Sequence, residues 1–219
     1  MEDRINYALK NFFTEKFVYE IGAFSYTLLE ESKKGKTRLF VNVGTEESIC
    51  FNNYDKFPKW EILVDKETTG LKKCIDHFIL KKNPSGIWEL HMFEMKTSIG
   101  FETWSNIKYK LRSSYLSIKA VALYLGIIIR DENITTYTTY EKDDKMEVEN
   151  MTDSKAMLPR VGDKAIDAKK DEWDAGVINV PIIVSESNPY DFYTAIRLRH
   201  SKILMNRAED GFLENTISL

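Results

Sequence analysis

The sequence predicts an α/β fold, a central mixed β-sheet flanked by helices, and three observations predict it. Residues 74–80 and 87–96 are expected to be two antiparallel strands, because a strong Asn-Pro-Ser-Gly turn signal separates them. Residues 103–126 carry apolar side chains at spacings of three and four, which predicts one long helix. Residues 127–129 form an unbroken apolar run, typical of a strand buried on both faces. Strand, helix and buried strand in this order form a crossover unit.

The N-terminal quarter of the chain predicts a helix and a hairpin. Residues 3–16 place their apolar side chains near one face, which indicates an amphipathic helix. Residues 17–29 and 37–43 are rich in aromatic and β-branched residues and are predicted to be paired strands. We expect a loop at 44–60 and a short strand at 60–64.

The C-terminal part predicts a long excursion followed by more strands. Residues 141–175 are highly charged and show no apolar periodicity, so we expect an exposed, flexible segment. Residues 177–184 are predicted to form a strand, and Pro181 within it favours the edge of a sheet. Another strand is expected at 190–199 and a closing helix at 200–210.

A length of 219 residues favours one domain spanning 1–219, built around a core at 60–140. Its charge is unevenly distributed. Residues 56–130 contain thirteen Lys/Arg and seven Asp/Glu, whereas residues 131–176 contain seven Lys/Arg and thirteen Asp/Glu. A basic segment inside an acidic protein is typical of a polyanion-binding surface.

Cysteine usage and the N-terminus predict a cytoplasmic location. Cys50 and Cys74 have no metal-type spacing and are expected to be free, buried thiols, as in a reducing compartment. The N-terminus has no basic stretch followed by an apolar one, so no signal peptide is predicted. The longest apolar run, at 120–129, is too short to cross a membrane.

The hairpin at 74–96 carries the candidate chemistry. Side chains alternate along a strand, so Glu94 and Lys96 point to the same face. The turn allows Asp76 to lie beside Glu94, so two carboxylates and a lysine are expected to meet. Mg²⁺ prefers oxygen ligands, which Asp76, Glu94 and the backbone carbonyl of Met95 could supply. Lys96 could then orient a water or stabilise negative charge. The alternative interpretation is an ordinary same-face salt pair at a strand end.

These residues resemble the pattern of the PD-(D/E)XK, or restriction-endonuclease-like, nucleases. Asp76 is followed, after seventeen residues, by Glu94-Met95-Lys96 at the end of the next strand. Within the predicted helix, Lys110-Leu111-Arg112-Ser113-Ser114 is similar to the Lys/Gln-Leu-x-x-Ser stretch of many members. The resemblance covers about residues 60–130, and it departs from the pattern at Ile75, where many members have proline.

The resemblance implies a metal-dependent endonuclease that hydrolyses DNA, with Mg²⁺ as cofactor and Mn²⁺ as substitute, acting in restriction, phage defence or a mobile element. RNA is the alternative substrate. Many members add an acidic residue from an earlier element, and the sequence leaves four candidates open: Glu20, Glu46, Glu47 and Glu61. A homodimer would suit cleavage of both strands, although no interface signature is visible.

The predicted helix also carries a basic face. Lys108, Arg112, Tyr115 and Lys119 recur at spacings of four, three and four, away from the apolar stripe, and Lys110 flanks them. We expect Lys108, Lys110, Arg112 and Lys119 to contact nucleic-acid phosphates. A plain solvated helix face is the alternative.

Two other interpretations of the protein's function are open. The chain could be a catalytically inactive nuclease-fold protein that binds nucleic acid or a protein partner. It could also be an interaction protein whose acidic segment 131–176 is the working surface. His77 and His91 fall on the hairpin face opposite the candidate site. They are expected to be packed features rather than zinc ligands, because zinc needs three or four ligands.

Overall fold

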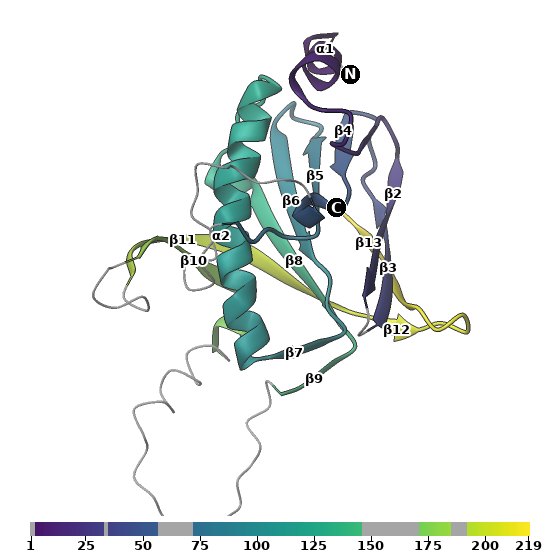
Figure 1. The fold of residues 1–219 in the computed structure, drawn as a ribbon, viewed down its shortest axis with the longest axis vertical. Helices are drawn as coiled ribbons and strands as arrows, with labels where there is room; N and C mark the ends of the chain where they lie inside the picture. The colour runs from purple at the N-terminus through teal and green to yellow at the C-terminus, as the bar shows by residue number, and fades with distance from the viewer. Residues whose placement is uncertain (1–2, 33–34, 57–71, 146–170, 185–191) are drawn as a thin grey trace, which may run out of the picture.

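A seven-stranded mixed sheet lies at the centre of the protein, between a long helix on one face and a four-stranded sheet on the other (Figure 1). This computed structural model describes residues 3–32, 35–56, 72–145, 171–184 and 192–219. The fold is α/β, as the sequence predicts. None of the helices in these ranges is long and apolar enough to span a membrane.

The elements follow one another from α1 to β13. The first part of the chain forms α1 (Asp3–Phe12), β1 (Tyr19–Ile21), β2 (Ser25–Ser32), β3 (Gly35–Asn42), β4 (Ser48–Phe51) and the 3-10 helix η1 (Tyr54–Lys56). The middle part forms β5 (His77–Lys82), β6 (Trp88–Glu94), β7 (Ser98–Gly100), α2 (Phe101–Tyr124) and η2 (Asp131–Asn133). The last part forms β8 (Ile134–Tyr140), β9 (Lys142–Lys145), β10 (Val177–Val184), β11 (Phe192–Leu204), β12 (Asn206–Arg207) and β13 (Leu213–Ser218).

The central sheet has the order β1-β4-β5-β6-β8-β11-β10. β5 and β6 form the predicted antiparallel hairpin, with His77 opposite Phe93. β6 and β8 are parallel, and α2 connects them across one face of the sheet. A strand–helix–strand crossover is therefore present, but its second strand is β8 and not the predicted strand at 127–129. β10 lies at the end of the sheet, so the prediction that Pro181 marks an edge strand is confirmed.

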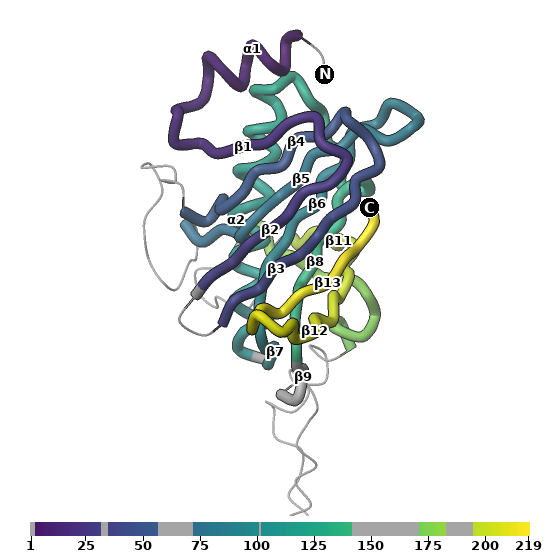
Figure 2. The backbone as a smooth tube through the Cα atoms, turned by 90° about the vertical axis from the view of Figure 1, so that its right-hand side faces the viewer, coloured from purple at the N-terminus to yellow at the C-terminus, as the bar shows by residue number. Residues whose placement is uncertain are grey.

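The second sheet has the order β12-β13-β3-β2, and it covers the face of the central sheet that α2 leaves open (Figure 2). β2 and β3 form an N-terminal hairpin, as predicted, but the single strand predicted at 17–29 is divided between β1 in the central sheet and β2 in the second sheet. β13 runs parallel to β3, which joins the two ends of the sequence in one sheet.

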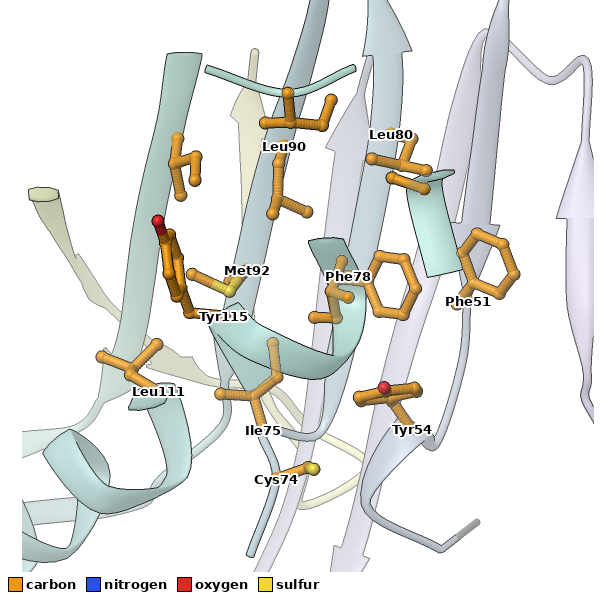
Figure 3. Packing of buried hydrophobic residues seen from close by; sticks show 14 of the residues in the cluster. Phe51, Tyr54, Cys74, Ile75, Phe78, Leu80, Leu90, Met92, Leu111 and Tyr115 are labelled. Atoms are coloured by element: carbon orange, nitrogen blue, oxygen red, sulfur yellow. The ribbon is translucent and has the colours of Figure 1, made fainter. Parts of the chain in front are cut away.

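Two hydrophobic cores separate the three layers. The larger core packs α1 and α2 against the central sheet, and Figure 3 shows Leu111 and Tyr115 of α2 near Met92 and Ile75. The smaller core lies between the two sheets and includes Leu28, Leu39, Ile79 and Phe93. Alternation explains the division, because neighbouring residues such as Phe78 and Ile79 point to opposite faces.

Several predicted elements are wrong. Residues 127–129 are not a strand: Ile127 and Ile129 are buried, whereas Ile128 is 75% exposed, so the run closes the end of the core. The parallel strand is β8. Its threonines and tyrosines favour a strand, but its sequence contains no long apolar run. The expected loop at 44–60 contains β4, a wholly buried strand.

The expected closing helix at 200–210 is also wrong. β11 continues to Leu204 as a thirteen-residue strand, because pairing with β8 outweighs its weak helical pattern. The predicted strand at 60–64 lies outside the described residues. So does most of the predicted excursion at 141–175, of which β9 and the helical turn at 171–174 are described.

Candidate active site

The β5–β6 hairpin brings Asp76 and Glu94 together at one end of the central sheet. Asp76 immediately precedes β5, and Glu94 is the last residue of β6. Because His77 pairs with Phe93, Asp76 lies one step further along the same register, beside Glu94. The backbone N–H of Met95 donates a 2.7 Å hydrogen bond to Asp76 Oδ2, which fixes this carboxylate against the strand end. The predicted register is confirmed.

Two lysines meet the paired carboxylates. Lys96, two residues after Glu94 on the same face, forms an ion pair with Glu94 Oε1 and lies 3.9 Å from Asp76 Oδ2. Its Nζ also donates to the backbone carbonyl of Met95 at 3.0 Å. Lys110 reaches in from α2, with its Nζ 2.6 Å from Glu94 Oε1 and 3.3 Å from Asp76 Oδ1. All the oxygens predicted to bind a metal therefore lie around these two ammonium groups.

Burial makes the electrostatics of this cluster strong. Glu94 is 1% exposed and Asp76 is 3% exposed. Burial raises the pKa of Glu94, the charge of Asp76 raises it further, and Lys96 and Lys110 oppose both effects. Burial alone would lower the pKa of Lys110, but Glu94 and Asp76 outweigh it and raise that pKa. Burial and Asp76 outweigh the two lysines, so the pKa of Glu94 stays above its ordinary value.

Hydrogen bonds from neighbouring elements hold the catalytic candidates in place. Ser114 of α2 accepts a 2.9 Å hydrogen bond from the backbone N–H of Ile75, next to Asp76. Thr139 of β8 accepts from the backbone N–H of Lys96 at 2.9 Å and donates to its carbonyl at 3.1 Å. The strand ends that carry the carboxylates and the lysine are thus tied to the crossover helix and to the parallel strand.

The cluster opens into a cleft of about 360 Å³ between the β2–β3 hairpin and the first half of α2. Glu94, Met95, Lys96 and Lys110 form one part of its lining. The rest is mostly small and neutral: Gly35, Thr37, Thr97, Ser98, Thr103, Asn106 and Ile107. A Cβ atom on Gly35 would lie 2.7 Å from the Thr97 side chain, so the hairpin can approach this closely only with glycine there.

Glu30, at the end of the cleft formed by β2, was not among the predicted acidic residues. Its Oε2 is buried without a hydrogen-bond partner and lies 3.9 Å from Lys56 Nζ. Burial and Asp76 raise the pKa of Glu30, and Lys56 opposes them. Strand alternation could have indicated it, because Tyr26 and Leu28 are buried and position 30 continues their face.

The four acidic candidates from the sequence are placed elsewhere or are not described. Glu20 accepts a hydrogen bond from Asn52 on an exposed surface, and Glu47 pairs with Lys82. Glu46 is exposed. Glu61 lies outside the described residues.

The predicted exposed basic face on α2 is wrong as a surface, although the lysines are present. Arg112 is only 3% exposed and Tyr115 belongs to the larger core. Lys108 forms an ion pair with the buried carboxylate of Glu172. Lys119 lies 2.8 Å from Asp131 Oδ1. The segment 171–174 lies against this part of α2, because Glu172 pairs with Lys108 and Trp173 packs edge-on against Trp104. Of the predicted phosphate contacts, Lys110 alone lines the cleft.

The histidines lie away from this cluster. His77 and His91 point to the face of the sheet opposite α2, as the sequence predicts, and both are buried. Burial lowers the pKa of each to about 4. His200 packs against Trp104 and Trp173, and its pKa is lowered by burial to about 3.

The oxygen donors of the cluster fit a hard divalent cation such as Mg²⁺. Glu94 Oε2 is buried without a hydrogen-bond partner, so this carboxylate has unused acceptor capacity. Within the described ranges, no group of three or more His, Cys, Asp or Glu side chains could hold an ion. A third protein donor would therefore be the Met95 carbonyl. Comparisons with protein-family models, with curated proteins and with solved structures find no match to this chain.

Proposed function

We propose that the protein is a metal-dependent endonuclease of the PD-(D/E)XK, restriction-endonuclease-like kind, hydrolysing phosphodiester bonds of DNA. The observation that carries the proposal is the meeting of Asp76, Glu94 and Lys96 beside an open cleft. The order of elements supports it as well. A strand after Asp76, a strand ending at Glu94, the helix α2 and the parallel strand β8 follow the order that the sequence resemblance implies.

Four residues of the cluster have a role in this proposal. Asp76, Glu94 and the Met95 carbonyl would hold Mg²⁺, or Mn²⁺ as its substitute. The bound cation would supply a Lewis acid and lower the pKa of a coordinated water. Lys96 lies within reach of both carboxylates and lines the cleft, so its ammonium can donate to a water or to a phosphate oxygen there.

The neutral lining of the cleft suits a phosphate backbone. Thr37, Ser98, Thr103 and Asn106 offer hydroxyl and amide donors, which bind phosphate oxygens without reading sequence.

The free thiols Cys50 and Cys74 are both buried, which agrees with the proposed cytoplasmic location.

Plasmid nicking tests the proposal. The purified chain is incubated with supercoiled DNA and Mg²⁺ or Mn²⁺, and open-circle and linear products are measured on agarose gels. Glu94→Gln keeps the shape of the side chain but removes the charged oxygen, so cleavage is expected to disappear. Lys96→Met is expected to lower the rate by about 10²-fold or more, the scale for loss of one preorganised donor.

Glu89→Gln is the matched control. Glu89 is on β6 as well, but it lies 3.6 Å from His91 on the opposite face of the sheet, so this variant is expected to cleave like the wild type. Equal cleavage by wild type and Glu94→Gln would exclude the proposed site.

A second candidate is a nuclease-fold protein that binds nucleic acid without cutting it. One observation favours it: Lys96 and Lys110 already balance the charges of Asp76 and Glu94. DNA that is retarded in a gel-shift assay and stays intact with either metal would establish this candidate in place of the enzyme.

A further inference from the structure

Lys110 is the member of the cluster that a phosphodiesterase mechanism does not account for. Its Nζ lies between the two carboxylates, 2.6 Å from Glu94 Oε1 and 3.3 Å from Asp76 Oδ1. It comes from α2 rather than from the hairpin, so its presence is set by tertiary packing. Its side chain is 23% exposed and lines the cleft.

Both carboxylate oxygens of Asp76 have a hydrogen-bond donor in this structure. Asp76 Oδ2 accepts the Met95 backbone N–H at 2.7 Å. Oδ1 is therefore the oxygen that this carboxylate can offer to a cation shared with Glu94, and Lys110 holds it. A divalent ion that bridges Asp76 Oδ1 and Glu94 Oε1 would have to take the position of the Lys110 ammonium, because two cations repel strongly at such distances in a buried site.

We propose that Lys110 is an internal counter-ion, which occupies the cation position between Asp76 and Glu94 until a divalent metal displaces it into the cleft. This inference rests on the proposed metal site and adds a regulatory step to it. The ammonium keeps two buried carboxylates from repelling each other in the metal-free protein. The Lys110 ammonium and a divalent metal therefore compete for the same carboxylate oxygens.

Displacement would also give Lys110 a second role. A lysine has a flexible four-carbon stem and three donors, so its ammonium can turn while its backbone stays in α2. The cleft that it lines is the space in which a phosphate backbone would lie. Metal binding would thus present a new positive charge to a polyanionic substrate at the moment the site is loaded.

Calorimetric titration of chelator-treated full-length protein with Mn²⁺ tests the competition. Lys110→Met removes the charge but keeps the length of the side chain, and is expected to bind Mn²⁺ about tenfold or more tightly than the wild type. Lys110→Arg keeps the charge and is expected to bind no more tightly than the wild type. Lys119→Met, on the same helix but paired with Asp131, is the matched control and is expected to match the wild type.

The outcomes separate the two proposals. Equal Mn²⁺ affinity of wild type and Lys110→Met would overturn the counter-ion role while leaving the metal site intact. No binding by either protein would overturn the metal site, and the counter-ion role with it. Binding by Lys110→Met alone would support both.

Lysine labelling provides a second test, which uses the wild-type protein alone and so does not depend on whether a variant folds. Lys110 is expected to resist acetylation in the metal-free protein, because two carboxylates hold its ammonium. Saturating Mg²⁺ is expected to increase its acetylation several-fold, measured by mass spectrometry of the Lys110 peptide, with Lys119 labelling unchanged. Lys110 labelling that stays constant while calorimetry shows bound metal would overturn the proposal.

Discussion

Ser114 shows how one buried residue can connect a sequence motif to the geometry of a site. It lies on α2 and is fully buried, and its hydroxyl accepts the hydrogen bond from the Ile75 N–H. Ile75 is the residue before Asp76, so this contact holds the backbone that carries the Asp76 carboxylate. The Lys-Leu-x-x-Ser stretch therefore places two side chains at the candidate site: Lys110 on the carboxylates and Ser114 on the backbone behind them.

Ser114→Ala tests this connection. The Ile75 N–H would be left buried without its partner, and such a loss costs about 1–3 kcal/mol. We expect urea unfolding to show a decrease of that size in the free energy of unfolding, together with weaker Mn²⁺ binding because Asp76 loses its support. Ser85→Ala, in the exposed turn of the hairpin, is the control and should unfold like the wild type. An unchanged midpoint for Ser114→Ala would show that this hydrogen bond contributes nothing to stability.

At the scale of elements, α2 is the part of the fold that both periodicity and end signals predict. The apolar stripe that includes Ile107, Leu111 and Ile118 is buried against the central sheet. Gly126 follows the helix with a φ of 72°, a left-handed conformation that glycine adopts without strain. The helix must stop here because residues 127–133 turn back to begin β8 beside β6.

Gly126→Ala tests the end of the helix. A Cβ at this position would have ordinary contacts with Arg4, so the cost comes from the backbone conformation and not from a clash. We expect a loss of about 1–2 kcal/mol in unfolding free energy, the usual cost of a left-handed residue with a side chain. Gly126→Asn should lose less, because asparagine tolerates this region better. Equal losses for the two variants would contradict the backbone explanation.

At the scale of the whole molecule, the three layers bury all three histidines of the chain. His77, His91 and His200 have pKa values lowered by burial to about 4, 4 and 3, below the ordinary value of 6.5. These three side chains therefore bind fewer protons in the folded protein than in the unfolded chain at any pH between these values. The stability that these neutral histidines permit is complete above pH 6.5 and is lost as the pH falls toward 4.

This prediction can be measured by urea unfolding between pH 7.5 and 4.5. Each histidine is expected to cost roughly one kcal/mol of stability per pH unit below 6.5. Glu94 and Glu30 act in the opposite sense, because their raised pKa values favour the folded state as these carboxyl groups become protonated, but they are two groups against three. His91→Gln should reduce the slope of unfolding free energy against pH by the amount that corresponds to about one bound proton. Stability that is constant or rising on acidification to pH 5 would show that the histidines are not neutral in the folded state.

Local pattern was sufficient for the parts of this protein that are specified over short distances. The β5–β6 turn, the parity of Glu94 and Lys96, the long helix and its end at Gly126 all depend on neighbouring residues, and the structure has each of them. The register that places Asp76 beside Glu94 also follows from one tight turn.

Tertiary structure decided what depends on partners distant in the sequence. β8 lacks an apolar run and becomes a central strand only because β6 and β11 bind it on both sides. Glu30 and Lys110 come to the cluster from a different sheet and from the crossover helix. Arg112 and Lys108 look solvated in the helical pattern, yet burial and Glu172 remove them from the surface. Periodicity shows which side of an element is apolar, but it does not show which segment covers the other side.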